Sequence, residues 1–311
     1  MGESDETMVK IIFSGLDNAG KTSILTALEK KYNFEDYIAK LRPTIKVDYK
    51  KTIFMGRIVN FWDMGGQQKY REQYKSRAEF YFSDTDLFIY LIDIQDEEKL
   101  PTSIEYLNDV LDFFAESQMD VPIIITFHKF DPDLRNDEVI LDRIESLKEQ
   151  ITKKLPDFKI LFQQTSIYDI ISIVQLVSYG LSIFDERFFD LSELMEKYID
   201  ILKSLSLILF DQNGIIISEF YSEEINQDLY IELLEDIREH IFILKRMEEE
   251  HTLVNDLTDM EGKIMWFLDR IQIKNENFFL SALINKDKRE LLEDNFGNLR
   301  EEVVNILTEM F

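Results

Sequence analysis

The sequence contains no cysteine and few basic residues: of its 311 residues, 35 are lysine or arginine and 61 are aspartate or glutamate. The absence of cysteine excludes disulfides, thiolate metal sites, cysteine nucleophiles and prenyl attachment. The net charge of −26 argues against a nucleic-acid ligand and against adsorption to an anionic membrane, because both would repel an acidic protein. No apolar run is long enough to span a membrane. We therefore expect a cytoplasmic protein with no direct membrane anchor, recruited to a membrane surface, if at all, by a partner.

The apolar content is sufficient for two folded domains. At 311 residues, of which 45% are hydrophobic, the chain exceeds what one compact core usually holds. We predict an acidic N-terminal tail over 1–7, a first domain over 8–185 and a second domain over 190–311. The intervening segment 185–189 has no glycine or serine, which predicts a fixed attachment rather than a flexible tether.

A glycine motif follows the first apolar run of the chain. Ile11, Ile12 and Phe13 lead into Gly-x-x-x-x-Gly-Lys-Thr, and apolar residues at helical spacing come after it. A strand, a glycine loop and a helix start in this order are typical of a P-loop, whose backbone N–H groups and helix dipole bind phosphate. The alternative is a chance glycine-rich turn, which the flanking strand and helix disfavour. The predicted phosphate-binding residues are Gly15, Leu16, Asp17, Asn18, Ala19, Gly20, Lys21, Thr22 and Ser23.

Two threonines and an aspartate are candidate magnesium ligands. In a P-loop, Lys21 reaches the β- and γ-phosphates and the Thr22 hydroxyl ligates Mg²⁺. Thr44 lies in an aperiodic segment, where a hydroxyl that completes the Mg²⁺ shell and an N–H on the terminal phosphate would both be lost on hydrolysis. Alone, its Pro-Thr pair is typical of an ordinary loop. Asp63 comes at the end of a predicted strand and would hold Mg²⁺ through water.

The segment after Asp63 carries a candidate catalytic residue. Predicted strands over Val47–Phe54 and Arg57–Trp62 lead into Asp63-Met64-Gly65-Gly66-Gln67. The Gly66 N–H can approach the terminal phosphate because no side chain blocks it. The Gln67 amide can orient the attacking water, so Gln67 and Thr44 are the predicted catalytic residues. An isolated Asp-x-Gly-Gly is usually a turn, but a second nucleotide motif at this place makes coincidence improbable.

Three further apolar runs predict strands. They cover Leu87–Ile94, Val121–Phe127 and Lys159–Phe162, and helical patterns lie between them. Alternating strands and helices predict an α/β fold, which we expect to be a mostly parallel six-stranded sheet with helices on both faces and ligand loops at the strand ends.

A base-reading motif follows the second of these runs. The Asp131 carboxylate can accept hydrogen bonds from N1–H and the exocyclic amine of guanine, neither of which adenine offers, so it favours GTP over ATP. Lys129 could lay its methylene stem over the base, and His128 could contact the base edge or brace the P-loop. Thr165, Ser166 and Ile167 offer N–H groups and hydroxyls for the guanine oxygen.

With these residues in place, the first half resembles a small GTPase of the Ras superfamily. The P-loop and Trp62–Gln67 are similar to Arf-type proteins, whereas His128–Asp131 and Thr165–Asp169 resemble the Rag (Gtr) GTPases. The resemblance implies binding of GTP or GDP with Mg²⁺, and hydrolysis that is slow without a GTPase-activating protein. We assign no internal arginine finger: Arg42 qualifies by position only, and a solvated loop arginine is its alternative reading.

The second half predicts an α+β domain. Asp190 and Glu193 form a capping-box pattern before a first helix. The remaining predicted elements are a hairpin over 205–210 and 215–220, a long helix over 228–249, strands over 252–257, 263–273 and 277–284, and a last helix over 287–308. This order resembles the roadblock/longin-like domain that follows the G domain in Rag proteins.

The resemblance also implies partners. It implies a homo- or heterodimer, with itself or with a second Rag-like subunit, through residues 190–311, and scaffold proteins of the roadblock/longin type. Three alternatives remain open: an Arf-like GTPase with an unrelated appended α/β domain, a nucleotide-locked scaffold without turnover, and an ATP-driven P-loop enzyme.

Overall fold

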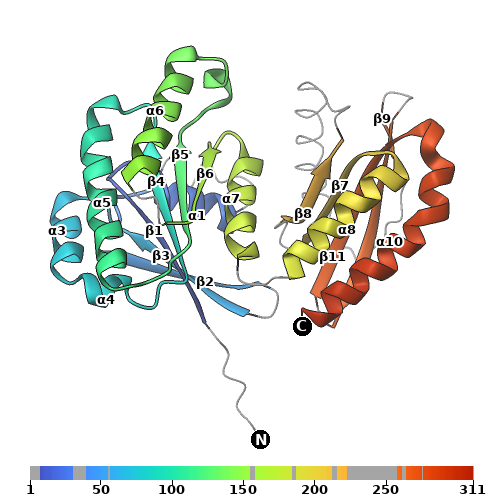
Figure 1. Cartoon of the computed structure of the whole chain (residues 1–311), viewed down its shortest axis with the longest axis horizontal. Coiled ribbons are helices and arrows are strands. Elements are labelled where there is room, and N and C mark those ends of the chain that lie inside the picture. Colours follow the sequence, from blue (N-terminus) through green and yellow to red (C-terminus); the bar gives the residue numbers. More distant parts are fainter. Residues whose placement is uncertain are drawn as a thin grey trace, which may run out of the picture. The chain divides into compact units, whose positions relative to one another are not determined.

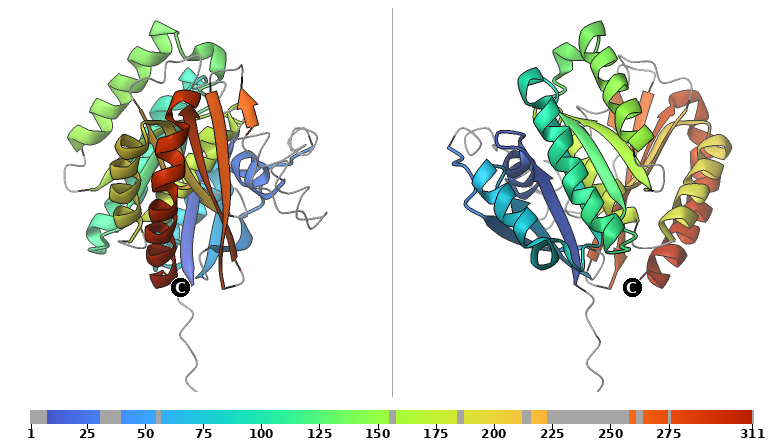
Figure 2. Two further views of the ribbon diagram at one scale, coloured as in Figure 1. Left: turned by 90° about the vertical axis from the view of Figure 1, so that its right-hand side faces the viewer. Right: turned by 60° about the vertical axis from the view of Figure 1, so that its left-hand side comes forward.

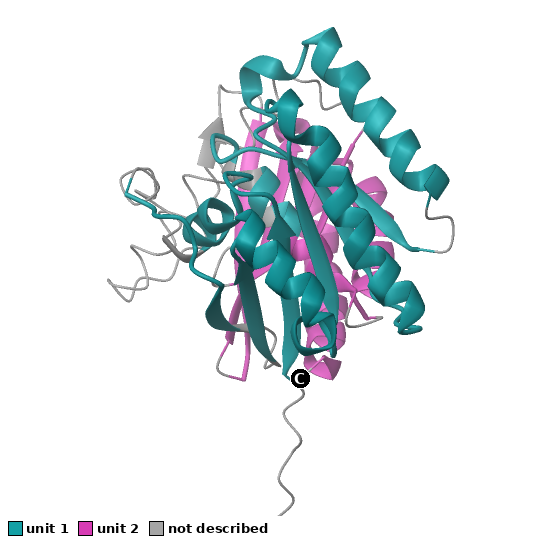
Figure 3. Ribbon diagram, turned by 90° about the vertical axis from the view of Figure 1, so that its left-hand side faces the viewer, with its two compact units in different colours: residues 1–176 teal, residues 177–311 magenta. Residues whose placement is uncertain are grey.

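The computed structural model describes residues 8–30, 40–54, 57–154, 158–183, 187–211, 216–222, 258–260, 264–274 and 276–310. The chain divides into two compact units, Met1–Leu176 and Val177–Phe311 (Figure 3). The division falls within helix α7 (Ile170–Ser182), ahead of the predicted boundaries at 185 and 190, which stay predictions. The predicted tail over 1–7 lies outside the described residues.

The first unit is built on a six-stranded sheet of order β2-β3-β1-β4-β5-β6. Its strands are β1 (Val9–Gly15), β2 (Val47–Phe54), β3 (Arg57–Met64), β4 (Leu87–Asp93), β5 (Ile123–His128) and β6 (Ile160–Thr165). Strand β2 pairs antiparallel with β3, and all other neighbours pair in parallel. This confirms the predicted fold class, and the strand predictions agree with the structure to within a few residues.

Helices cover both faces of this sheet. They are α1 (Lys21–Lys30), α3 (Gln68–Ser76), α4 (Ala78–Phe82), α5 (Leu100–Glu116) and α6 (Glu138–Lys154), with 3₁₀ turns η1 (Glu97–Lys99) and η2 (Pro132–Leu134). Alternate residues of a strand point to opposite faces of the sheet. Because every residue of β4 from Leu87 to Ile92 is fully buried, both faces of this strand are covered. Its Phe88, Tyr90 and Ile92 pack in one cluster with residues of α5 and α6, which lie together on one face (Figures 1 and 2).

The topology gathers the predicted site residues at one edge of the sheet. Strand β1 ends at Gly15, β3 runs through Asp63, and β5 ends at His128. Because β1, β3 and β5 run in the same direction, the loops that follow them emerge at the same edge. The described residues contain no helix long and apolar enough to cross a membrane.

In the part of the second unit that the structure describes, two helices pack on an antiparallel sheet of order β8-β7-β11-β10-β9. The elements are α8 (Arg187–Leu202), β7 (Ser204–Asp211), β8 (Ile216–Tyr221), β9 (Thr258–Met260), β10 (Ile264–Ile273), β11 (Glu276–Asn285), η3 (Lys286–Lys288) and α10 (Arg289–Glu309). Helices α8 and α10 contact each other and the sheet (Figure 1). The Phe267 and Phe296 rings meet edge to face at 4.3 Å, and Arg300 donates to Asp269 at 2.8 Å, which joins α10 to β10.

Two predictions in this unit need comment. The capping box was wrong: α8 begins at Arg187, and Asp190 lies inside its first turn, because the buried stripe of the helix already starts at Phe188. The hairpin is confirmed as β7 and β8. The predicted helix over 228–249 and strand over 252–257 lie outside the described residues, and β9 at Thr258–Met260 follows them.

Candidate functional site

The glycine motif forms the loop between β1 and α1. Lys21 begins α1, and its buried ammonium donates to the carbonyls of Gly15 at 3.0 Å and Leu16 at 2.6 Å. These bonds curl the loop around the lysine. Burial lowers the pKa of Lys21 to about 8, against the opposing effect of the Asp63 and Asp17 carboxylates. The loop therefore holds a desolvated cation, whose charge a phosphate would stabilise.

Three predicted magnesium ligands from separate segments meet beside the loop. The Thr22 hydroxyl donates to Asp63 Oδ2 at 2.5 Å, the Thr44 hydroxyl donates to the same oxygen at 3.1 Å, and the two hydroxyl oxygens lie 2.8 Å apart. Asp63 is fully buried, and its other oxygen, Oδ1, has no hydrogen-bond partner among the described residues. Burial raises the pKa of the Asp63 carboxyl, although Thr22, Lys21 and Thr44 oppose this.

This donor set fits Mg²⁺. Two hydroxyls and a carboxylate are hard oxygen ligands, and Mg²⁺ usually completes its shell with waters and substrate phosphates rather than with further carboxylates. The orphaned Asp63 Oδ1 is a buried acceptor that a metal-bound water would satisfy. Among the described residues no cluster of three or more His, Cys, Asp or Glu could hold a metal by itself.

The segment after Asp63 is fastened to the P-loop through backbone groups. The Asp17 N–H donates to the Gly66 carbonyl at 3.1 Å, and Arg71 Nε donates to the same oxygen at 3.0 Å. A Cβ on Gly66 would lie 2.2 Å from the Leu16 carbonyl carbon, so only glycine allows this approach. Gln67 is half-buried and immediately precedes α3, and its backbone carbonyl accepts from the Tyr70 N–H at 2.9 Å.

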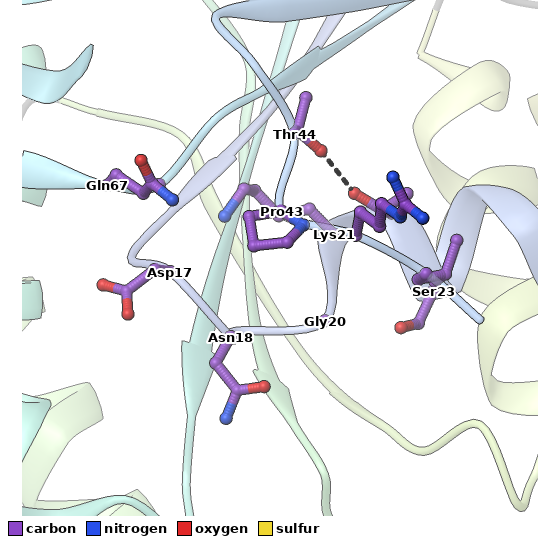
Figure 4. A pocket seen from close by; sticks show the side chains of 12 residues that line it. Asp17, Asn18, Gly20, Lys21, Ser23, Pro43, Thr44 and Gln67 are labelled. Carbon is purple, nitrogen blue, oxygen red and sulfur yellow. Dashed lines mark hydrogen bonds between the residues drawn. The ribbon is translucent and has the colours of Figure 1, made fainter. Parts of the chain in front are cut away.

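A cavity of about 310 Å³ lies between these segments. Figure 4 shows Thr44 pointing toward the P-loop and joined to it by a hydrogen bond, with Asp17 and Gln67 around the loop. The residues that line the cavity are Asp17, Asn18, Gly20, Lys21, Thr22, Ser23, Leu41, Arg42, Pro43, Thr44, Gly66 and Gln67. Arg42 is exposed and also lines the cavity, which is compatible with both of its readings.

His128 lies behind the P-loop. A Cβ on Gly20 would lie 2.3 Å from His128 Cδ2, and Gly20 has a φ of +93°, a conformation that favours glycine. His128 Nδ1 is 2.9 Å from the Thr165 hydroxyl, which is 2.7 Å from the Thr126 hydroxyl. Burial and the neighbouring charge of Lys129 lower the pKa of His128 to about 3, so the ring is neutral at pH 7. Of the two roles predicted for His128, the geometry favours the P-loop brace.

Asp131 and Lys129 are held on either side of the same turn. Asp131 Oδ1 accepts from the Ser166 hydroxyl at 2.5 Å, and Asp131 Oδ2 accepts from the Gln95 amide at 2.9 Å. Lys129 Nζ lies 2.6 Å from Asp93 Oδ2. The hydroxyls of Thr165 and Ser166 thus support His128 and Asp131 directly. Ile167 is half-buried and follows them in the turn that leads to α7.

Comparison with known proteins identifies the family. The "Gtr1/RagA G protein conserved region" matches residues 10–241, three quarters of the chain. The chain belongs to the Gtr1/RagA family of G proteins. The Rag and Arf-like resemblance within the Ras superfamily is thereby confirmed, whereas the roadblock/longin-like character of the second unit stays a prediction.

One sequence relative and one solved structure are similar to parts of this Gtr1/RagA G protein. ADP-ribosylation factor-like protein 3 from Chlamydomonas reinhardtii is 35% identical over 126 residues, 40% of this chain and 65% of that protein. The chain thus spans just under two thirds of this relative. A solved structure, the Arl6 BBS3 small GTPase from Trypanosoma brucei with bound nucleotide analogue GppNp, is 18% identical, with a TM-score of 0.46 over 56% of this chain and 96% of that one.

The contacts of the G protein's site that the sequence reasoning missed include those of three side chains. These are Arg71 on α3, Gln95 after β4 and Lys99 in η1. Gln95 and Lys99 bond predicted site residues that are 36 and 82 positions away in the chain, whereas Arg71 bonds Gly66 from five positions away. Their residue types carry no motif, and only the folded neighbourhood brings them to the site.

Proposed function

We propose that this Gtr1/RagA G protein is a switch that binds GTP or GDP with Mg²⁺ and hydrolyses GTP slowly unless a GTPase-activating partner is present. The observation that carries the proposal is the meeting of Thr22, Thr44 and Asp63 beside the buried Lys21. Mg²⁺, when bound, neutralises charge on the phosphates. Asp131, with both oxygens already oriented, supports the choice of guanine.

The site residues have separate parts in this proposal. Lys21 binds the β- and γ-phosphates, and the P-loop N–H groups surround them. Gln67 orients the water that attacks the terminal phosphate. Thr44 changes its contacts when that phosphate leaves, which releases its segment from Thr22 and Asp63. No arginine finger is assigned within the chain, so a supplied one would raise the rate by roughly 10³–10⁵-fold.

The test compares nucleotides and one substitution. GDP with Mg²⁺ should raise the melting temperature of the purified protein, whereas ADP should not, because ligand that binds only the folded state stabilises it. Wild-type protein should turn GTP over slowly, Gln67→Leu should abolish turnover, and Gln68→Leu, the same change one residue later, should not. Tight guanine binding with no turnover in the wild type would instead favour the nucleotide-locked scaffold, and stabilisation by ADP an ATP-driven enzyme.

The second unit supports a further part of the proposal. A helix, a hairpin, further antiparallel strands and a last helix, with the strand order β8-β7-β11-β10-β9, are compatible with a roadblock/longin-like domain. We propose that residues 190–311 form a dimer, with a copy of this chain or with a second Rag-like subunit. We further propose that scaffold proteins of the roadblock/longin type bind this protein and that it is cytoplasmic. Sedimentation of the protein alone and with candidate subunits tests the dimer. A monomer under all conditions would favour the Arf-like alternative with an unrelated domain.

A further inference from the structure

Asp17 is an unexpected residue for the wall of a phosphate site. Its side chain is half-exposed and lines the cavity together with Lys21, Gly66 and Gln67 (Figure 4). A carboxylate there repels phosphate oxygens, and the repulsion grows with each phosphate charge. The backbone of Asp17 cannot withdraw freely, because its N–H is bonded to the Gly66 carbonyl.

Lys99 supplies the opposite charge from a distant part of the chain. It ends the 3₁₀ turn η1, and its ammonium lies 3.4 Å from Asp17 Oδ2 and 3.5 Å from the Asp17 carbonyl oxygen. A second carboxylate, Asp96, lies 3.3 Å from the same ammonium. Burial acts to lower the pKa of Lys99, but Asp17 and Asp96 together raise it above its usual value. Lys99 is therefore charged whenever the protein meets a nucleotide at neutral pH.

We propose that the Asp17–Lys99 ion pair sets the preference of the site between GTP and GDP. The inference rests on the proposed function, in which Gly66 and Gln67 face the terminal phosphate. The Asp17 N–H is bonded to the Gly66 carbonyl, and Asp17 lines the cavity together with Gly66 and Gln67, so we expect its carboxylate to act mainly on the phosphate that GTP has and GDP lacks. Lys99 holds the carboxylate and offsets its repulsion. Asp17 without Lys99 would weaken the binding of GTP relative to GDP. When Lys99 is paired with Asp17, GTP can bind without this penalty.

A double-mutant cycle tests the pair. The dissociation constants for GDP and for a non-hydrolysable GTP analogue, both with Mg²⁺, are measured for wild type, Lys99→Gln, Asp17→Asn and the double variant. Lys99→Gln should weaken analogue binding relative to GDP by about 2- to 5-fold, the range expected for a half-exposed ion pair. In the Asp17→Asn background the same substitution should have a clearly smaller effect, because residues that act through each other are not additive.

Three controls sharpen the result. Lys75→Gln removes the same charge from another surface pair, with Asp109 at 2.9 Å, and should leave the ratio of the two constants unchanged. Lys99→Arg keeps the charge and should restore a ratio close to that of wild type. Raising the salt concentration should reduce the effect of Lys99→Gln, because the pair is exposed enough to be screened.

The outcomes separate the inference from the proposed function. The protein could bind GDP and the analogue with a ratio of dissociation constants that neither single substitution changes. That result would overturn the role of the ion pair and would leave the proposed switch function intact. Strictly additive effects in the cycle overturn the inference that Lys99 acts through Asp17. Wild-type protein that binds neither nucleotide overturns both.

Discussion

The carboxamide of Gln95 connects the two residues proposed to read the base. Its Nε2 donates to the Lys129 carbonyl at 2.7 Å and to Asp131 Oδ2 at 2.9 Å, so one amide spans the turn between them. Lys129 has a φ of +62°, a conformation that costs energy for a residue with a side chain. A bond to its carbonyl helps to hold that conformation, and a bond to a carboxylate is stronger than one between neutral groups.

Gln95→Leu is therefore expected to weaken guanine binding. The substitution removes both bonds, and the bond from the Ser166 hydroxyl to the Asp131 carboxylate remains. We expect release of GDP to become about 3- to 10-fold faster, which is less than a hydrogen bond to a charged group usually contributes because Gln95 is exposed. The rate of GDP release in excess unlabelled nucleotide measures this. Gln150→Leu, on the exposed side of α6, is the control, and unchanged release in Gln95→Leu would contradict the prediction.

His128 predicts a pH dependence of stability. Its pKa is about 3 in the folded protein and about 6.5 in an unfolded chain, so between these values the unfolded state binds more protons. The folding contribution of the neutral ring is complete above pH 6.5 and is lost as the pH falls toward 3. The slope is at most about 1.4 kcal/mol per pH unit.

Denaturant unfolding of wild type and His128→Asn from pH 7 to pH 4.5 tests this. Other groups titrate in both proteins, and the difference between their free energies of unfolding isolates position 128. That difference should shift in favour of His128→Asn as the pH falls. A difference that stays constant over this range would show that the ring is not buried as described.

At the scale of elements, the turn between β3 and α3 is the tightest part of the site. Gly65 donates to the Lys46 carbonyl at 2.6 Å, and a Cβ on Gly65 would lie 2.7 Å from the Thr44 carbonyl oxygen. A Cβ on Gly66 would meet backbone atoms of the P-loop residues Leu16 and Asp17, which cannot rotate aside. Two successive glycines are thus required by two different neighbours.

Gly66→Ala should damage the site, and Gly297→Ala should not. At Gly66 the new methyl group must push the turn away from Leu16 and Asp17, and we expect at least a 10-fold loss of affinity for a GTP analogue, measured by calorimetry. At Gly297, inside α10, the methyl group meets nothing within 4 Å. There alanine should raise the free energy of unfolding by up to about 1 kcal/mol through helix propensity. Equal effects at the two positions would contradict this account.

Helices and strands were easier to predict from the sequence than contacts between residues that are distant in the chain. Buried parallel strands such as Leu87–Asp93 are continuous apolar runs, and the P-loop is a local motif, so both could be read directly. The start of α8 was misplaced because a polar cap pattern at Asp190 competed with an apolar stripe that begins earlier. Gln95 and Lys99 could not be predicted, because their contacts with Asp131 and Asp17 span 36 and 82 positions of the chain.

At the scale of the whole molecule, the dominant property is the net charge of −26. Such an excess of like charge opposes the compact state through self-repulsion, which salt screens over about 10 Å at 0.1 M. Surface ion pairs such as Lys75–Asp109 and Lys153–Glu149 are exposed, and each contributes little that salt could remove. Repulsion should therefore outweigh them in the response to salt.

We expect the melting temperature to rise by several degrees when NaCl is increased from about 20 mM to about 300 mM, because the screening length becomes much shorter between these concentrations. Scanning calorimetry of the nucleotide-free protein measures it. Sucrose at equal osmolality is the control for effects unrelated to charge. A melting temperature that falls with salt would mean that attractive pairs dominate instead.

The bond from Gly65 to the Lys46 carbonyl has one more consequence. Lys46 directly precedes β2, and Tyr74 of α3 donates to the same carbonyl at 2.6 Å, so the start of one strand, the end of the next and the following helix are tied at a single atom. Strand β2 lies at the edge of its sheet, and eight residues of strand extend about 27 Å. In the proposed function the terminal phosphate lies beside Thr44, and we expect its loss to displace this end of β2. A binding partner could sense the state of the nucleotide at the far end of β2 without touching the cavity at all.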